Sequence, residues 1–347
     1  MITRKIFGCG LIAVIFALAF TACDGGTTGG GGGGSGGDMN WTAVADSTFG
    51  SSPINAIAYG GGKFVAVGNQ GKMATSPDGV TWTEVPMGTI WAIITGTTYY
   101  MSDIRAIAYG GGKFVAGGSQ GRMATSPDGV TWTAVANTYS TFGNDWIYTV
   151  AYGNNKFVAV SSNGRMATSP DGVTWTAVAN TPFSIDAIAY GNNRWVAGGG
   201  DKMATSPDGT TWTAVGDSTF STSDNAYIGA IAYGNNRWVA GGGNGKMATS
   251  SNGTTWTAVA DSTIWQYTDW DGELQTAAIN AIAYANNRFV AVGGADWVAG
   301  KMVTSTNGTT WTAVADSTFI YDTILGIAYG NGKWVTVGGS GKIAYSN

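Results

Sequence analysis

The amino-acid sequence predicts an all-β fold built from one repeated unit. Only 11% of the residues are charged and 56 of the 347 are Gly, a composition typical of short strands joined by tight turns. A segment ending in Ala-Tyr recurs at roughly the 40–50-residue period of a four-stranded propeller blade. Together these observations predict a closed seven-bladed β-propeller of antiparallel blades over residues 40–347. The seven copies end at Tyr59, Tyr109, Tyr152, Tyr190, Tyr233, Tyr284 and Tyr329.

Each repeat divides into four short strands, most clearly in residues 54–85. The strands read INAIAY, KFVAVG, GKMATS and TWTEV in that repeat. Gly-Gly-Gly-Lys or Gly-Asn-Asn-Arg joins the first two strands, where Gly and Asn accept positive φ. The first two strands are nearly continuous apolar runs rich in Ala and Gly, a pattern that favours sheets covered on both faces.

The two ends of the repeat region predict that the ring is closed. The last repeat stops at Asn347 after its third strand, while Asn40–Val44 reads as a fourth strand with no blade before it. Pairing these segments completes the seventh blade and removes the sheet edges that an open array would expose.

The turn between the third and fourth strands carries a repeated motif, SPDGVTW or a variant such as SSNGTTW. Its Asp or Asn can accept backbone N–H bonds within the turn, its Gly can take positive φ, and its Trp can pack on neighbouring strands. These Asp residues could instead bind a ligand or metal, but identical repetition around a ring favours a structural role. The structural residues are Asp78, Trp82, Asp128, Trp132, Asp171, Trp175, Asp208, Trp212, Asn252, Trp256, Asn307 and Trp311.

This motif resembles a shortened Asp-box, the turn of bacterial neuraminidase repeats in sialidase-like propellers. The resemblance implies a propeller fold, and in the enzymes of that family an Arg triad with a Tyr–Glu nucleophile pair. Apart from Arg4, only Arg105 falls outside a repeated Lys/Arg position, and Glu84 and Glu273 are the only glutamates. No triad or nucleophile pair is found, so no enzyme activity is expected. A seven-bladed, lipid-anchored propeller is also similar to the lipoproteins that assist photosystem II assembly, whose Arg patch is not matched here.

The connection from the fourth strand to the next blade varies most in length. Antiparallel order places these connections on one face, together with the turn between the second and third strands. The insertion at Gly293–Lys301 emerges on that same face. Because loops on a rigid scaffold commonly carry function, we expect this face to bind the ligand.

Aromatic and acidic residues are common in these connections. Aromatic rings can stack on sugars or anchor a protein partner, although they could also form small loop cores of their own. In the sixth repeat we expect the Trp side chains to converge into the main ligand contact. The candidate ligand-binding residues are Trp265, Tyr267, Asp269, Trp270, Asp271, Asp296 and Trp297 in that repeat, and Trp91, Tyr99, Tyr100, Tyr139 and Trp146 elsewhere.

A calcium ion near Asp269, Asp271 and Glu273 is only a weak alternative, because the twelve-residue calcium-loop pattern is incomplete. No other metal and no cofactor is expected. The chain contains no His, which excludes His catalysis and His metal ligands. Its formal net charge is −4 with no basic cluster, so nucleic acid is not expected as a partner.

Residues 1–22 read as a secretion signal, with Arg4 and Lys5 before a short apolar run. Phe20-Thr21-Ala22-Cys23 resembles a lipobox, which implies that Cys23 is acylated and that the chain is cut just before it. The alternative is ordinary cleavage with a free thiol at Cys23. Residues 23–39 would then be the lipidated Cys and a flexible Gly-rich tether. We expect no disulfide in the mature protein, since Cys9 leaves with the signal.

The sequence therefore favours an exported, lipid-anchored, monomeric binding module that recognises glycan or protein through its variable-loop face. A protein-assembly scaffold of the envelope is the first alternative, and a divergent glycoside hydrolase is the second.

Overall fold

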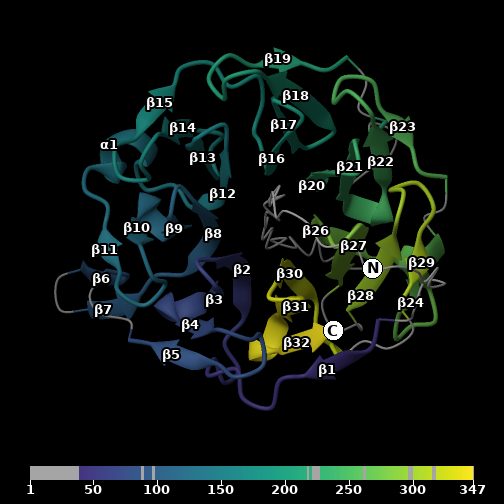
Figure 1. The fold of residues 1–347 in the computed structure, drawn as a ribbon, viewed down its shortest axis with the longest axis horizontal. Coiled ribbons are helices and arrows are strands. Elements are labelled where there is room, and N and C mark those ends of the chain that lie inside the picture. The colour runs from purple at the N-terminus through teal and green to yellow at the C-terminus, as the bar shows by residue number, and fades with distance from the viewer. Residues whose placement is uncertain are drawn as a thin grey trace, which may run out of the picture.

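The computed structural model describes residues 39–86, 90–95, 98–216, 219–220, 227–260, 263–295, 300–314 and 318–346, with residues 93–95 and 98–100 described by backbone alone. These residues form a ring of four-stranded antiparallel sheets around a central axis, as the sequence predicts (Figure 1). The blades, numbered in chain order, contain the following strands: blade 1, β2 (Ile54–Gly60), β3 (Lys63–Gly68), β4 (Met73–Ser76) and β5 (Thr83–Val85); blade 2, β8 (Ile104–Gly110), β9 (Lys113–Gly118), β10 (Met123–Ser126) and β11 (Thr133–Ala134); blade 3, β12 (Ile147–Gly153), β13 (Lys156–Ser161), β14 (Met166–Ser169) and β15 (Thr176–Val178); blade 4, β16 (Ala187–Gly191), β17 (Arg194–Gly199), β18 (Lys202–Ser206) and β19 (Thr213–Ala214); blade 5, β20 (Ile228–Gly234), β21 (Arg237–Gly242), β22 (Met247–Ser250) and β23 (Thr257–Ala258); blade 6, β26 (Ala278–Ala285), β27 (Arg288–Gly294), β28 (Lys301–Ser305) and β29 (Thr312–Ala313); blade 7, β30 (Ile324–Gly330), β31 (Lys333–Gly338), β32 (Ile343–Ser346) and β1 (Trp41–Ala43).

Ring closure by the N-terminal strand is confirmed. Strand β1 pairs antiparallel with β32, and Trp41 lies opposite Ser346. The inner strands of blades 1 and 7 also meet directly, because the ring of Tyr59 lies against Gly330. The N-terminal strand is therefore the fourth strand of blade 7. Blade 1 follows it in the chain and packs its inner strand against the inner strand of blade 7.

The first strand of each blade lies nearest the axis and is called the inner strand below (Figure 1). In six blades its signature Tyr packs against the Gly that ends the inner strand of the preceding blade. A Cβ atom on Gly60 would lie 2.0 Å from Cγ of Tyr109, so a side chain at this position needs the ring to move. The small residues of the repeat therefore let neighbouring blades approach closely.

The two faces of the ring are those that strand order predicts. On one face, a turn between second and third strands meets a connection between blades: the Gln70 N–H donates to Asp103 Oδ1 at 3.0 Å. On the opposite face, Asn331 Nδ2 donates to the Pro77 carbonyl, which joins an inner-strand turn of blade 7 to the motif turn of blade 1. The first face is called the loop face and the second the turn face.

The loop-face connections contain regular structure that the sequence pattern did not indicate. Two hairpins occur there, β6 (Ala92–Thr95) with β7 (Thr98–Met101), and β24 (Gln266–Thr268) with β25 (Leu274–Thr276). Short helices complete the described set: α1 (Thr138–Phe142), η1 (Asn69–Gly71), η2 (Ser119–Gly121), η3 (Gly243–Gly245), η4 (Thr263–Trp265) and η5 (Gly339–Gly341). In the described part of the chain, none of the helices is long and apolar enough to span a bilayer.

Candidate binding site on the loop face

The motif turns have the geometry that a structural role requires. In blade 1, Asp78 Oδ1 accepts the N–H groups of Val80 and Thr81 at 2.9 and 2.8 Å. The Trp82 Nε1–H donates to the carbonyl of Gly79, whose φ is +76°. The same bonds recur at Asp128, Asp171, Asp208, Asn252 and Asn307. The carboxylates are thus engaged in their own turns on the turn face, away from the loop face.

Two of the candidate tryptophans are buried. Trp265 is fully buried and Trp91 is 1% exposed, so neither side chain reaches a ligand without moving. Each occupies the place that a Phe takes in other connections, for example Phe49, which is equally buried. These aromatics pack the connections onto the blades, which is the loop-core alternative that the sequence left open.

A cation at the start of the third strand or directly before it supports this packing in six blades. Lys72 Nζ donates to the Phe49 carbonyl at 2.8 Å, and Arg165 donates to the Phe142 carbonyl at 2.7 Å. The sequence contained a signal for this arrangement. The tripeptide Ser-Thr-Phe precedes four inner strands, and Ser-Thr-Ile-Trp takes its place before blade 6. The equivalent donors are Arg122, Lys246, Lys301 and Lys342.

The two blade 6 tryptophans that the structure describes do not lie on one surface. Trp270 is 92% exposed at the tip of the β24–β25 hairpin, whereas Trp265 is in the core. Tyr267 is half-buried, and burial together with the Asp269 charge raises the pKa of its hydroxyl. Asp296 and Trp297 lie outside the described residues, so their place in the expected cluster stays a prediction.

The Asp269 carboxylate stabilises the hairpin in which it lies. Asp269 Oδ1 accepts the N–H groups of Asp271 and Glu273, and Asp269 Oδ2 accepts Gln275 Nε2. Among the described residues, no group of three or more acidic or Cys side chains is placed to hold a metal ion. The weak calcium alternative therefore gains no support from the geometry.

The remaining candidates differ in exposure. Tyr139 of α1 is 65% exposed and Trp146 is 38% exposed. The backbone of Tyr99 and Tyr100 lies in β7, and their side chains are outside the described part. A groove of about 360 Å³ beside α1 is lined by Ser, Thr, Asn, Ala, Val and Trp175, without a charged group.

One position that the sequence reasoning missed stands out on the loop face. An Ile lies at or near the start of every inner strand, and the residue after it varies among the blades while its surroundings repeat. In six blades this residue is the β-bulge at which the register shifts. We call these the axial positions: Asn55, Arg105, Tyr148, Asp186, Gly229, Asn280 and Leu325.

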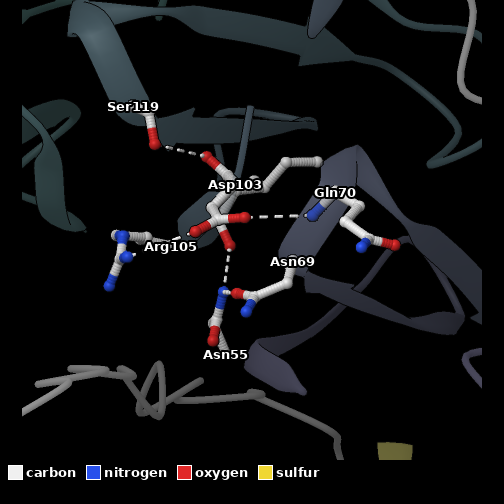
Figure 2. A network of polar contacts seen from close by, with 7 residues as sticks. Asn55, Asn69, Gln70, Asp103, Arg105 and Ser119 are labelled. Carbon is white, nitrogen blue, oxygen red and sulfur yellow. Dashed lines mark hydrogen bonds and ion pairs between the residues drawn. The ribbon is translucent and has the colours of Figure 1, made fainter. Parts of the chain in front are cut away.

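Several axial side chains join their blade to the next one. Asn55 Nδ2 donates to the Ile104 carbonyl at 2.8 Å, and Asn280 Nδ2 donates to the Ile324 carbonyl at 2.9 Å. Figure 2 shows Asn55 in this bridging place, beside Asn69 and below Asp103. Both Asn residues are buried, and their hydrogen bonds hold neighbouring blades together. We call Asn55 and Asn280 the Asn staples.

Arg105 makes a different bridge between blades. Its guanidinium pairs with Asp103 at 3.2 Å and lies 4.1 Å from the ring centroid of Trp146 in the next blade (Figure 2 shows the Asp103 pair). Trp146 in turn meets Tyr148 edge-on, with centroids 6.3 Å apart. Cation–π contact of this kind orients the indole as well as attracting it.

The backbone under Trp146 is fixed by blade 3. The Trp146 N–H donates to Ser162 Oγ, and the Trp146 carbonyl accepts the Ser162 N–H at 2.8 Å. The preceding Asp145 accepts Ser161 Oγ and Asn163 Nδ2. Trp146 is therefore an exposed aromatic side chain on a rigid base, as a binding residue should be.

The accessible axial residues lie in neighbouring blades. Tyr148 and Asp186 are half-buried, whereas the axial residues of the other five blades are buried. Tyr227, just before β20, is half-buried and feels the charge of Asp186. We call Trp146, Tyr148, Asp186 and Tyr227 the axial sector. It combines aromatic surface with one carboxylate, which suits recognition of another molecule more than catalysis.

Fold and site together define a seven-bladed propeller with a non-repeating sector on its loop face. Residues 98–214 match the family described as DUF6242 beta propeller domain. Comparison with curated proteins found no match.

Three solved structures share the fold. The structure of YCF48 bound to D1 peptide has a TM-score of 0.63 at 16% identity, over 89% of this chain and 95% of that chain. YCF48 from Cyanidioschyzon merolae gives 0.62 at 16% identity, over 88% and 98%. The WD40 beta propeller domain of Doa1 gives 0.62 at 10% identity, over 90% and 97%. At these identities the likeness shows the fold alone.

Proposed function

We propose that this chain is a non-catalytic binding module of the cell envelope that recognises a protein partner through the axial sector of its loop face. The observation that carries the proposal is the contrast within the repeat. Positions that build the blades recur almost unchanged, whereas the axial positions differ in every blade except for the two Asn staples. A structural need common to all blades would have produced a common residue.

The chemistry of the sector agrees with this proposal. Exposed Trp and Tyr side chains on a fixed backbone are frequent anchors of protein interfaces. One propeller of the same fold, YCF48, has been solved with a peptide bound. The sialidase-type Arg triad and nucleophile pair are missing from the sequence, which is why we propose binding rather than hydrolysis.

The test compares two exposed aromatic sites on the same chain. Trp146→Ala with Tyr148→Ala should reduce capture of the partner from a native envelope fraction at least tenfold, because truncated interface anchors commonly lose about 2 kcal/mol. Trp270→Ala is the matched control and should capture as wild type does. The opposite result would move the site to the blade 6 hairpin, and a glycan array then tests whether that site binds sugar.

Anchoring at Cys23 is a separate part of the proposal. Cys23 follows the lipobox-like Phe20-Thr21-Ala22, and the Gly-rich segment after it would hold the ring away from the bilayer. Cys23→Ser should move the protein from the membrane fraction to the soluble fraction and abolish labelling with radioactive palmitate. Labelling that persists in the variant would contradict acylation at this residue.

A further inference from the structure

The two charged axial residues are in opposite situations. The Arg105 guanidinium is paired with Asp103 and covered by the ring of Trp146. Asp186 lies two blades further around the ring. Within the described residues, its carboxylate accepts one hydrogen bond, from the Gly200 N–H at 3.3 Å, and no Lys or Arg lies within ion-pair distance of it.

Three other carboxylates just before inner strands, among the residues that the structure describes, are compensated by a cation. Asp103 has Arg105, Asp145 has Arg165 at 3.4 Å, and Asp322 has Lys342 at 2.6 Å. Asp186 is the exception in this series. Burial raises the pKa of its carboxyl group, which shows that the surroundings compensate its charge poorly.

The neighbours of Asp186 are aromatic instead of basic. Gly200 joins the two segments, because its N–H donates to Asp186 and its carbonyl accepts the N–H of Ile228, the residue after Tyr227, at 2.9 Å. Burial and then the Asp186 charge raise the pKa of the Tyr227 hydroxyl, in agreement with this placement. Tyr148 holds the axial position of the preceding blade, whose inner strand β12 packs against β16. A carboxylate with tyrosines in the neighbouring segments can attract a cation through its charge, and the ring faces add to that attraction.

We propose that Asp186, with Tyr148 and Tyr227 beside it, is a subsite for a Lys or Arg side chain of the partner. The inference rests on the proposed function and adds the charge of the segment that is bound. It also agrees with the acidic character of the chain, whose formal net charge is −4. The partner supplies the cation that the described part of the chain does not place beside Asp186.

The test uses hexapeptides selected on the purified protein from a random phage-displayed library. Each selected peptide is resynthesised with Lys replaced by norleucine, or Arg by citrulline, which removes the charge and keeps the stem. Asp186→Asn removes the charge of the subsite without changing its shape, and Asn stands at the equivalent positions 55 and 280. Asp271→Asn on the exposed hairpin is the control with the same change in net charge.

We expect selected peptides to contain Lys or Arg and to bind at least tenfold more weakly to Asp186→Asn, while Asp271→Asn binds as wild type does. The uncharged peptides should bind the wild type and Asp186→Asn equally. Removing the cation from the peptide already abolishes the interaction that Asp186→Asn would remove. Equal binding of the charged peptides to wild type and Asp186→Asn overturns the subsite. If those peptides still need Trp146 and Tyr148, the proposed function stands; if they need neither, it fails as well.

Discussion

Gly110 illustrates how single residues set the spacing between blades. It ends β8, and a Cβ atom there would lie 2.0 Å from Cγ of Tyr152 in blade 3. The same relation joins Gly60 to Tyr109 and Gly330 to Tyr59, so it runs across the point of closure. Blade 6 has Ala285 in place of this Gly. The fold therefore accommodates one methyl group at this position in blade 6.

Gly110→Ala should accordingly destabilise the protein without preventing folding. We expect a loss of about 1–3 kcal/mol in the free energy of unfolding, the usual cost of overpacking a close contact. Gly216→Ala is the control, because nothing lies within 4 Å of a Cβ atom at that residue. Urea denaturation measures both variants, and equal midpoints would show that the Tyr152 ring moves freely.

At the residue scale, sequence predicted the proposed binding residues only in part. It named Trp146, which is exposed, but also Trp91 and Trp265, which are buried. Aromatic content alone does not separate an anchor that points inward from one that points outward. The recurrence of Phe49, Phe220 and Phe319 could have identified the inward set. Asp186 and Tyr227 were missed because neither lies in a conspicuous cluster, although the variation after the recurring Ile was visible.

At the scale of the elements, the Asp residues of the motif turns make the stability of the fold depend on pH in the acid range. Two backbone N–H groups, those of Thr131 and then Val130, lower the pKa of Asp128 to about 2 from an ordinary value of 3.8. Thr174 and then Val173 act in the same way on Asp171, whose pKa is also about 2. Because the folded-state pKa is lowered, these carboxylates stabilise the fold above about pH 4, and that stabilisation is lost as the pH falls toward 2.

Asp78, Asp128, Asp171 and Asp208 can be replaced together by Asn. The stability that the protein loses between about pH 4 and pH 2 should then be smaller than in wild type. Asn keeps the accepting oxygen, as Asn252 and Asn307 do in blades 5 and 6. Melting temperatures over this pH range, compared with wild type, measure the effect. An unchanged acid dependence would mean that other carboxylates control it.

The elements themselves were predicted to different degrees. All four strands of each blade follow from apolar runs and turn residues that recur seven times, and the structure places them accordingly. The β6–β7 and β24–β25 hairpins were not predicted, because each occurs once and lies outside the repeated unit, although the sequence has turn-favouring residues between their strands, Gly96 and Asp271-Gly272. A sequence pattern that recurs seven times supports a prediction of strands, whereas a connection that occurs once provides no such recurrence.

On the scale of the whole molecule, closure of the ring is the main structural device. The N-terminal strand covers the edge of β32, and the Val44 N–H adds a bond to the Ile343 carbonyl at 2.9 Å. This architecture was predictable because the missing fourth strand of the last repeat is present at the start of the chain. The partner and its place on the ring were not, since they depend on residues that do not repeat.

Deleting residues 40–45 should lower the melting temperature of the entire domain, because the edge of β32 and the core beneath Trp41 become exposed. Deleting residues 31–36 of the Gly-rich segment removes the same length of chain and should change nothing. Equal melting temperatures for the two deletions would contradict a stabilising role for closure.

The central claim is that a partner binds the loop face at the axial sector. The most direct measurement is photo-crosslinking in intact cells with benzoylphenylalanine placed at Tyr148 or, on the turn face, at the exposed Val130. Both variants should fold, since one side chain is half-buried and the other is 46% exposed. We predict a discrete adduct of higher mass from position 148 and none from position 130. An adduct from position 130 with none from position 148 would contradict the account.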